Sequence, residues 1–202
     1  MDIFYLQHNP VPKEKSLYVF DSNVWLPLLG LESEEISDRY SEFFSKVMKT
    51  PGCKILLCPI QLSEILNRLL RYHAKIAYDK KYSNVKGQKP NPSEFYKGEY
   101  RSSEDFKKKY ATILDDIDQY SEGLKFCDIQ TNDFATLTTF KGSALDFNDN
   151  YLYLLAKEYD ATIITHDGDF HDLDIRVGTY NKKLYQAYKD SVKPIAAPKP
   201  QA

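Results

Sequence analysis

Short apolar runs rich in β-forming residues alternate along this chain with longer segments of helical periodicity. The runs cover residues 16–20, 54–58, 124–129, 161–165 and 175–177. Their length and composition are typical of buried strands. Strands that are separated by helices pair in parallel, and the helices cover both faces of the sheet. The sequence therefore predicts an α/β fold, a three-layer α/β/α sandwich with a mainly parallel central sheet.

Helices are predicted between these strands from apolar periodicity and from capping residues. Leu62, Leu66 and Leu69 define the apolar face of one of them, and Pro59 suits its first turn. Gly30 should end the helix that follows the first strand. The predicted helices cover about residues 22–29, 35–49, 59–78, 102–122, 131–140 and 146–159.

The length of 202 residues favours one domain with elaborations. We expect that domain to span residues 16–192, after an irregular lead-in over residues 1–15. An insertion is expected at about residues 79–110, and its first part should be loop-like because prolines and glycines recur there. Residues 193–202 are rich in Pro, Ala and Lys and are predicted to be a disordered tail.

Composition narrows the function classes. The net charge of −2 excludes a predominantly basic nucleic-acid coat, so any RNA binding must come from local basic patches. The three cysteines are an odd number without zinc-type pairing and are interpreted as reduced thiols. No apolar run approaches the roughly 20 residues of a membrane span. We expect a soluble, cytoplasmic protein without a membrane partner.

Two predicted strands end in acids. Asp21 directly follows Phe20, and Asp167 follows the strand that ends at Thr165. The carboxyl ends of parallel strands meet at one edge of a sheet, where ligand sites form. Both carboxylates are therefore expected near that edge. The alternative for each is a structural role, in which the side chain only caps the next helix or turn.

Further acids are expected at the same edge. Glu64 lies early in the helix after the second strand, away from its apolar face, although an ion pair with Arg68 would also explain it. Asp149 lies only about 60° from the inward face of its own helix, and a carboxylate pointing inward is costly unless it is paired or metal-bound. Its alternative role is to stabilise the helix dipole from the first turn. Asp146 could share the site or cap the helix, and Asp169 is favoured as a turn residue.

Closely packed carboxylates repel each other, and a divalent cation removes that penalty. Oxygen ligands without clusters of Cys or His select Mg²⁺ or Mn²⁺. One or two such ions can activate water and stabilise a leaving oxygen during attack on phosphate. The acids therefore predict phosphodiester hydrolysis.

Four segments resemble the motifs of the PIN-domain ribonuclease family, which includes the VapC-like toxins. They are residues 18–23, 60–65, 149–156 and 163–170, and their order and spacing agree with the family over about residues 16–178. The last segment, with Thr165, Asp167, Asp169 and Phe170, is the most specific. The resemblance implies a PIN-like topology, related to RNase H-like and FEN-like folds, and a metal-dependent endoribonuclease acting on single-stranded or structured RNA.

The resemblance also implies roles for residues of this chain. Asp21, Glu64, Asp149 and Asp167 would be catalytic and hold the metal. Thr165 and Asn23 would support the site, with Asp169 as a further supporting residue. The third motif contains both Asp146 and Asp149, so the main third ligand stays open between them, with Asp149 favoured.

The segment from Lys75 to Lys109 has a net charge of +5 with interleaved aromatic residues. Such a segment can follow a phosphate backbone and stack bases. The candidate RNA-binding residues are Lys97, Arg101, Lys107, Lys108 and Lys109. A solvated loop and a docking surface for a protein are the alternatives.

Two other functions compete with the ribonuclease. A phosphatase of the haloacid-dehalogenase type also places an Asp after its first strand, but it needs a second carboxylate where this chain has Asn23. A catalytically inactive PIN-like scaffold or RNA-binding module is the other, and the presence of all four acids argues against it. The resemblance further suggests a toxin of a toxin–antitoxin pair, with an antitoxin protein as partner and a homodimer as a possible assembly.

Overall fold

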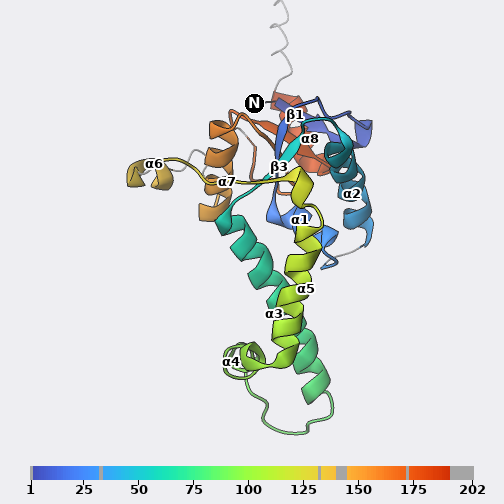
Figure 1. Cartoon of the computed structure of the whole chain (residues 1–202), viewed down its shortest axis with the longest axis vertical. Coiled ribbons are helices and arrows are strands. Elements are labelled where there is room, and N and C mark those ends of the chain that lie inside the picture. Colours follow the sequence, from blue (N-terminus) through green and yellow to red (C-terminus); the bar gives the residue numbers. More distant parts are fainter. Residues whose placement is uncertain (1, 32–33, 132, 140–144, 172, 192–202) are drawn as a thin grey trace, which may run out of the picture.

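The computed structural model describes residues 2–31, 34–131, 133–139, 145–171 and 173–191, with the backbone alone for residues 34–38. Its described strands form a six-stranded, all-parallel sheet in the order β1-β6-β5-β2-β3-β4. The strands are β1 (Asp2–Tyr5), β2 (Leu17–Phe20), β3 (Lys54–Leu57), β4 (Leu124–Phe126), β5 (Thr162–Ile164) and β6 (Arg176–Thr179). The predicted fold class is confirmed (Figure 1).

Helices cover both faces of this sheet. One face carries α1 (Ser22–Leu28), α2 (Glu34–Lys49) and the start of α3 (Pro59–Tyr82), and the other carries α7 (Phe147–Glu158) and α8 (Lys182–Ser191). Side chains alternate between the two layers, as a pleated strand requires. Phe20 packs with the α1–α2 layer, whereas its neighbour Val19 packs with the α7–α8 layer.

The direction of winding reverses between β2 and β5. From β2 the chain adds β3 and β4 on one side, and later places β5 and β6 on the other side. Parallel sheets bind ligands beyond the carboxyl ends of the strands at such a switch point. Asp21 and Asp167 follow the two strands that flank it.

The prediction of an irregular lead-in was wrong for its first residues. Asp2–Tyr5 forms β1, which pairs in parallel with β6, and a short 3-10 helix, η1 (Leu6–His8), follows. Ile3 and Leu6 are buried, so this edge strand is held by apolar packing as well as by the ladder. Pro10 and Pro12 belong to the connection that leads to β2.

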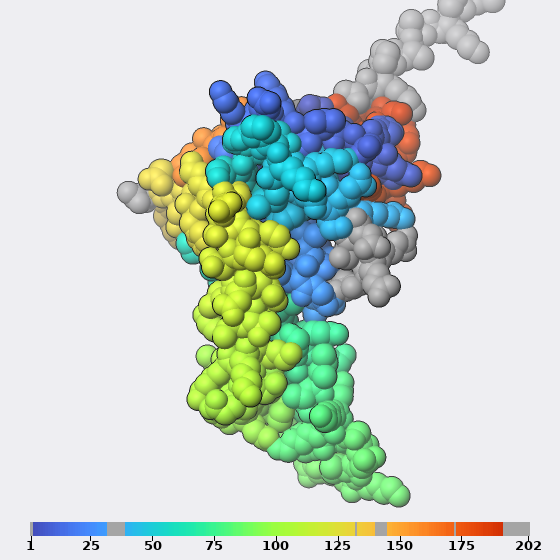
Figure 2. All heavy atoms as spheres, turned by 45° about the vertical axis from the view of Figure 1, so that its right-hand side comes forward, coloured from blue at the N-terminus to red at the C-terminus, as the bar shows by residue number. Residues whose placement is uncertain are grey.

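The predicted insertion is a folded helical arm, so the loop-like interpretation of its first part holds for residues 83–91 and was wrong for the residues in α3, α4 and η2. The helix α3 runs on to Tyr82, and α5 (Glu104–Asp118) returns beside it (Figures 1 and 2). At the far end, α4 (Pro92–Gly98) and the 3-10 turn η2 (Tyr100–Ser102) close the arm. Asn91 and Glu94 form a capping box that starts α4, and buried Phe95, Tyr96 and Tyr100 form a small core there.

The remaining elements are short. A 3-10 turn, η3 (Ser121–Gly123), leads into β4, and α6 (Phe134–Thr138) is shorter than predicted. The helix α8 was not predicted from the sequence. The Asn181 side chain caps it by accepting hydrogen bonds from the backbone of Lys183 and Leu184. The predicted tail at residues 193–202 lies outside the described residues.

Two expectations from composition can be compared with the described residues. None of the described helices is both long and apolar enough to cross a membrane. Cys53, Cys58 and Cys127 are all free thiols.

Candidate active site at the carboxyl edge of the sheet

Asp21 is buried at the end of β2, with only 5% of its surface exposed. It caps α1, and one of its oxygens, Oδ2, accepts hydrogen bonds from Thr165 Oγ1 at 2.6 Å and from Asn23 Nδ2 at 2.7 Å. Burial raises the pKa of Asp21 to about 6, and the nearby charges of Glu64 and Asp167 add to the increase. Asp21 therefore caps α1 and also lies at the edge of the candidate site, so its structural role does not exclude a functional one.

Thr165 and Asn23 join the ends of β2 and β5. Besides donating to Asp21, the Thr165 hydroxyl accepts from the Asp167 backbone N–H at 2.9 Å and from Asn23 Nδ2 at 3.2 Å. The Asn23 side-chain oxygen accepts from the backbone N–H of His166 at 3.1 Å. Both residues are thus placed to fix the orientation of Asp21, as their predicted supporting roles require.

Glu64 lies on α3 and reaches the same edge. Its Oε2 atom accepts from Ser22 Oγ and from Asn148 Nδ2, each at 3.1 Å, so three elements meet at this carboxylate. Arg68 lies 3.5 Å from the other oxygen, Oε1. The ion pair considered as an alternative is therefore present, and it does not draw Glu64 away from the site.

Asp146 and Asp149 have different surroundings in the first turn of α7. Asp146 is exposed and caps the helix by accepting from the backbone N–H of Asp149 at 3.0 Å. Asp149 is half-buried, and burial together with the charges of Asp21, Asp146 and Asp167 raises its pKa to about 7. The structure gives the cap to Asp146 and brings Asp149 within electrostatic reach of Asp21 and Asp167. A role of Asp146 as a further ligand stays a prediction.

The loop after β5 holds two more predicted acids. Asp167 is half-buried, and its Oδ1 atom accepts from the backbone N–H of Asp169 at 2.9 Å. Asp169 is exposed, in keeping with the favoured turn role. Asp21, Glu64, Asp149 and Asp167 therefore gather around the switch point of the sheet, while Asp169 lies at its margin.

Several residues that shape this edge were not identified from the sequence. Tyr40 of α2 is fully buried, and its hydroxyl donates to the Thr165 carbonyl at 2.9 Å and accepts from the Tyr180 backbone N–H at 3.1 Å. Asn181 donates to the His166 carbonyl at 2.8 Å. The sequence offered no signal for Tyr40, because an aromatic residue on a helix normally indicates core packing.

The carboxylates of the candidate site are chemically suited to bind a hard divalent cation, although they do not converge on one point. Across the described residues, no three Asp, Glu, His or Cys side chains are arranged as they stand to hold an ion. The donors at the edge are carboxylate oxygens, and both burial and mutual repulsion raise the pKa of Asp21 and Asp149. A bound cation would relieve both costs, so this set of residues fits Mg²⁺ or Mn²⁺.

The predicted RNA-binding residues lie away from this edge, on the arm. Lys107 pairs with Glu104, and Lys109 lines a hollow near the end of the arm together with Lys80 and Lys81. Arg101 lines another hollow, between α3 and α5. Lys97 and Lys108 are exposed. The aromatic residues expected to stack bases fit less well, since Phe95, Tyr96 and Tyr100 are buried.

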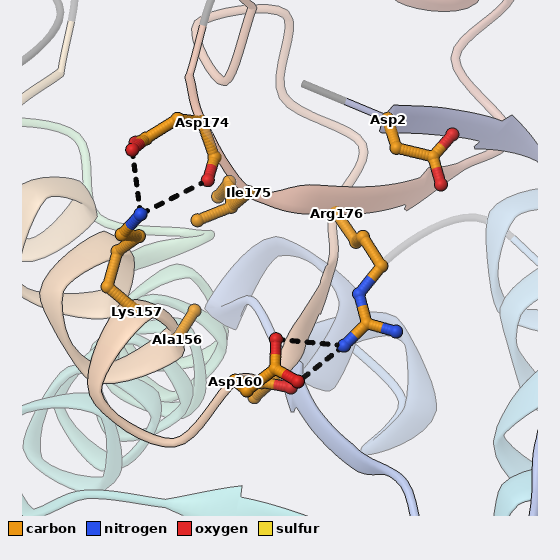
Figure 3. A pocket seen from close by; sticks show the side chains of 8 residues that line it. Asp2, Ala156, Lys157, Asp160, Asp174, Ile175 and Arg176 are labelled. Atoms are coloured by element: carbon orange, nitrogen blue, oxygen red, sulfur yellow. Dashed lines mark hydrogen bonds and ion pairs between the residues drawn. The ribbon is translucent and has the colours of Figure 1, made fainter.

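A different charged hollow lies at the opposite edge of the sheet, where β5 and β6 begin (Figure 3). Lys157 contacts Asp174 at 2.7 Å, and Arg176 contacts Asp160 at 3.1 Å, so two of the three acids that line this hollow have a basic partner. Local ion pairs of this kind are a structural arrangement. The carboxyl edge, where acids adjoin other acids, is the better candidate for catalysis.

Two solved structures resemble this chain at low similarity, and each match covers 81% of this chain. The VapBC2 complex of Rickettsia felis bound to a DNA fragment from its promoter has 13% identity and a TM-score of 0.43 over 98% of its matched chain. The FitAB complex bound to IR36 DNA has 15% identity and a TM-score of 0.44 over 94% of its matched chain.

Similarity at this level indicates neither a shared partner nor a shared substrate. No curated protein matches the chain. The PIN domain family, in contrast, matches residues 18–176, a range that contains every acid of the candidate site. The predicted resemblance is confirmed: this chain belongs to the PIN domain family.

Proposed function

We propose that this protein is an endoribonuclease that hydrolyses phosphodiester bonds of RNA with Mg²⁺ or Mn²⁺. PIN domains are generally nucleases. The observation that carries the proposal is the placement of four acids around the switch point of the sheet, where burial and neighbouring acids raise the pKa of Asp21 and Asp149. Strongly perturbed acids in such a position are candidates for a functional site.

Asp21, Glu64, Asp149 and Asp167 are the residues that would hold the metal. When bound there, a divalent ion supplies a nucleophilic water and stabilises the leaving oxygen. The chain itself supplies orientation. Thr165 and Asn23 donate hydrogen bonds to Asp21, and Ser22 and Asn148 donate to Glu64. These hydrogen bonds restrict the rotamers of both carboxylates and hold them toward the site.

The phosphatase alternative fits the site less well. In that chemistry the second residue after the nucleophilic Asp is a carboxylate that exchanges protons with the substrate. Here that residue is Asn23, whose amide nitrogen donates to Asp21 and Thr165 and whose oxygen accepts from His166. A role in positioning accounts for all of these contacts. An inactive scaffold would not need four acids at one edge.

The finer predictions rest on the family resemblance. A role as the toxin of a toxin–antitoxin pair, an antitoxin partner, a homodimer and a cytoplasmic location all stay predictions. The ribonuclease activity is tested first, because a role as a toxin depends on it.

The test is cleavage of a 5′-labelled single-stranded RNA by the purified full chain. We expect cleavage with millimolar Mn²⁺ or Mg²⁺, none with EDTA, and none from Asp149→Asn in either condition. A matched substitution at the opposite edge of the sheet, Asp160→Asn, should cleave like the parent chain. Equal cleavage by the parent and by Asp149→Asn would overturn the proposal.

A further inference from the structure

A groove along α3 leads away from the candidate site. Its inner part, a hollow of about 350 Å³, is lined by Glu64 and Asn148 and continues past Arg68 and Arg71. Its outer part, a hollow of about 390 Å³ between α3 and α5, shares Ser63 and Asn67 with the inner part. Ser63 and Asn67 line both hollows, so the two adjoin along this stretch of α3, and the inner one begins at an acid of the proposed active site.

The α3 side of this groove is basic. Arg68, Arg71 and Lys75 follow Glu64 at intervals of four, three and four residues, so they lie along one face of the helix. At about 1.5 Å per residue, Arg71 lies roughly 10 Å and Lys75 roughly 16 Å along the helix from Glu64. A row of positive charges on this scale can contact successive phosphates of one strand.

The Arg71 guanidinium has a fixed support. It lies over the ring of Tyr96, 4.9 Å from the ring centre, and only 7% of the Tyr96 surface is exposed. A cation held over a buried aromatic ring loses little further freedom when an anion binds. The small core at the end of the arm thus positions a charge that faces the groove.

The outer hollow is suited to bases. Its lining includes the apolar side chains of Leu66, Leu70 and Phe106, and at its rim lie Arg101 and Tyr110. Tyr110 is 41% exposed, and it stacks on the ring of Phe106 at 6.2 Å between ring centres. An exposed ring above an apolar floor offers a stacking surface for an unpaired base.

We propose that a single RNA strand lies along this groove, with its phosphates on Arg68 and Arg71 and its bases toward Tyr110. This inference rests on the proposed ribonuclease function, since it supplies the substrate path for that site. It differs from the lysine path predicted from the sequence. Lys107 does not line the groove, and Lys109 lines a separate hollow with Lys80 and Lys81.

Binding can be measured apart from cleavage. The full chain carrying Asp149→Asn is titrated with a fluorescently labelled 12-nucleotide oligouridylate, and fluorescence anisotropy gives the affinity at several salt concentrations. Adding Arg68→Gln and Arg71→Gln should weaken binding on the order of 10-fold at 0.1 M salt, and should reduce the salt slope by about 1.4, or about 0.7 for each phosphate that is no longer neutralised. Arg68→Lys with Arg71→Lys should keep the slope.

A matched control removes the same charge elsewhere. Lys46→Gln with Lys49→Gln has the same spacing on α2, where the helix ends near the amino edge of the sheet, and should leave affinity and slope unchanged. Tyr110→Ala should weaken binding several-fold at constant slope. Arg71→Gln alone should lower the slope by about 0.7 even if the double α3 variant does not fold.

The failures of the two proposals are distinguishable. If the parent chain, with Asp149 intact, cleaves no RNA with Mn²⁺, the ribonuclease proposal fails. If the parent chain cleaves RNA but the Arg68→Gln/Arg71→Gln variant binds with the affinity and slope of the α2 control, the groove is not the RNA path. Loss of binding only on replacement of Lys107, Lys108 and Lys109 would overturn the groove in favour of the lysine path.

Discussion

Asp149 and Asp174 lie near opposite ends of α7. Other acids surround Asp149, whereas a lysine contacts Asp174. Asp149 is near the carboxyl edge of the sheet, where burial and three neighbouring acids raise its pKa to about 7. Asp174 is at the amino edge, where hydrogen bonds from Lys157 and Tyr153 lower its pKa to about 2. The chain supplies its own cation at the amino edge. At the carboxyl edge, the shifts of Asp149 come from burial and from acids, which is the arrangement expected of a site that takes its cation from solution.

The largest difference between the two edges should appear in catalysis. We expect Asp21→Asn to reduce RNA cleavage at least 100-fold, because the amide is a weaker metal ligand, and removing even a group that only supports a metal ligand costs about 10- to 100-fold. Asp174→Asn should remain within about 2-fold of the parent chain. Initial rates of cleavage of a labelled RNA at saturating Mn²⁺ test both, and similar rates for the two variants would contradict the contrast.

Metal binding should stabilise the fold through the acids of the carboxyl edge and not through those of the amino edge. At 100 times its dissociation constant, Mn²⁺ should stabilise the fold by about 2.7 kcal/mol. For a chain of this size that corresponds to an increase in melting temperature of about 5 to 10 °C. Scanning fluorimetry with and without Mn²⁺ should show this increase for the parent chain and for Asp174→Asn. Asp21→Asn should show little or none, and an increase equal to that of the parent would place the metal elsewhere.

The pH dependence of stability should have opposite signs at the two edges. The pKa of Asp21 and that of Asp149 exceed the ordinary value of 3.8, so between about pH 4 and pH 7 the folded, metal-free protein binds more protons than the unfolded chain. Stability from these groups therefore falls as the pH rises through that window. Asp174, with its lowered pKa, stabilises the fold above about pH 4 and loses that effect as the pH falls toward 2.

Urea unfolding in EDTA at pH 4.5 and pH 7.5 measures this effect. The decrease in unfolding free energy between the two values should be smaller in Asp149→Asn than in the parent chain. Asp174→Asn should keep the full decrease. If Asp149→Asn and the parent change by the same amount, Asp149 does not titrate in this window.

The smallest effect is expected from the ion pairs at the amino edge. Lys157→Met removes the contact with Asp174, whose side chain is 68% exposed. Exposed pairs are worth about 0 to 1 kcal/mol, so the unfolding free energy should fall by no more than that. Chemical denaturation at pH 7 and moderate salt provides the measurement. A decrease of several kcal/mol would mean that solvent does not screen this ion pair.

Local signals account for what the sequence could predict. Five of the six described strands are short apolar runs, and each of the four candidate acids lies next to a strand end or in the first turns of a helix. The rule that parallel strands share a carboxyl edge was enough to bring those acids together. The N-cap role of Asp146 likewise follows from its place before α7.

Features that depend on distant contacts were not predicted. The first strand, β1, is stabilised by pairing with β6, which no local pattern specifies. The hydrogen bonds of Tyr40 to Thr165 and Tyr180 span α2 and the ends of β5 and β6. In the arm, prolines and glycines indicated a loop, whereas the packing of Tyr100 favours a folded end. The capping box of Asn91 and Glu94 was a local signal for the start of α4 that those prolines and glycines outweighed.

The strand order also sets the time at which the site can exist during synthesis. The central strand β5 completes the edge beside β2, but about 140 residues separate Asp21 from Thr162. A ribosome that adds about 5 to 20 residues per second needs roughly 7 to 28 s for that stretch. Until then the nascent chain carries Asp21, Glu64 and Asp149 without Thr165 and Asp167. A nascent chain that has not reached β5 therefore lacks one acid of the edge and the threonine that positions Asp21, and the proposed activity requires synthesis at least through residue 167.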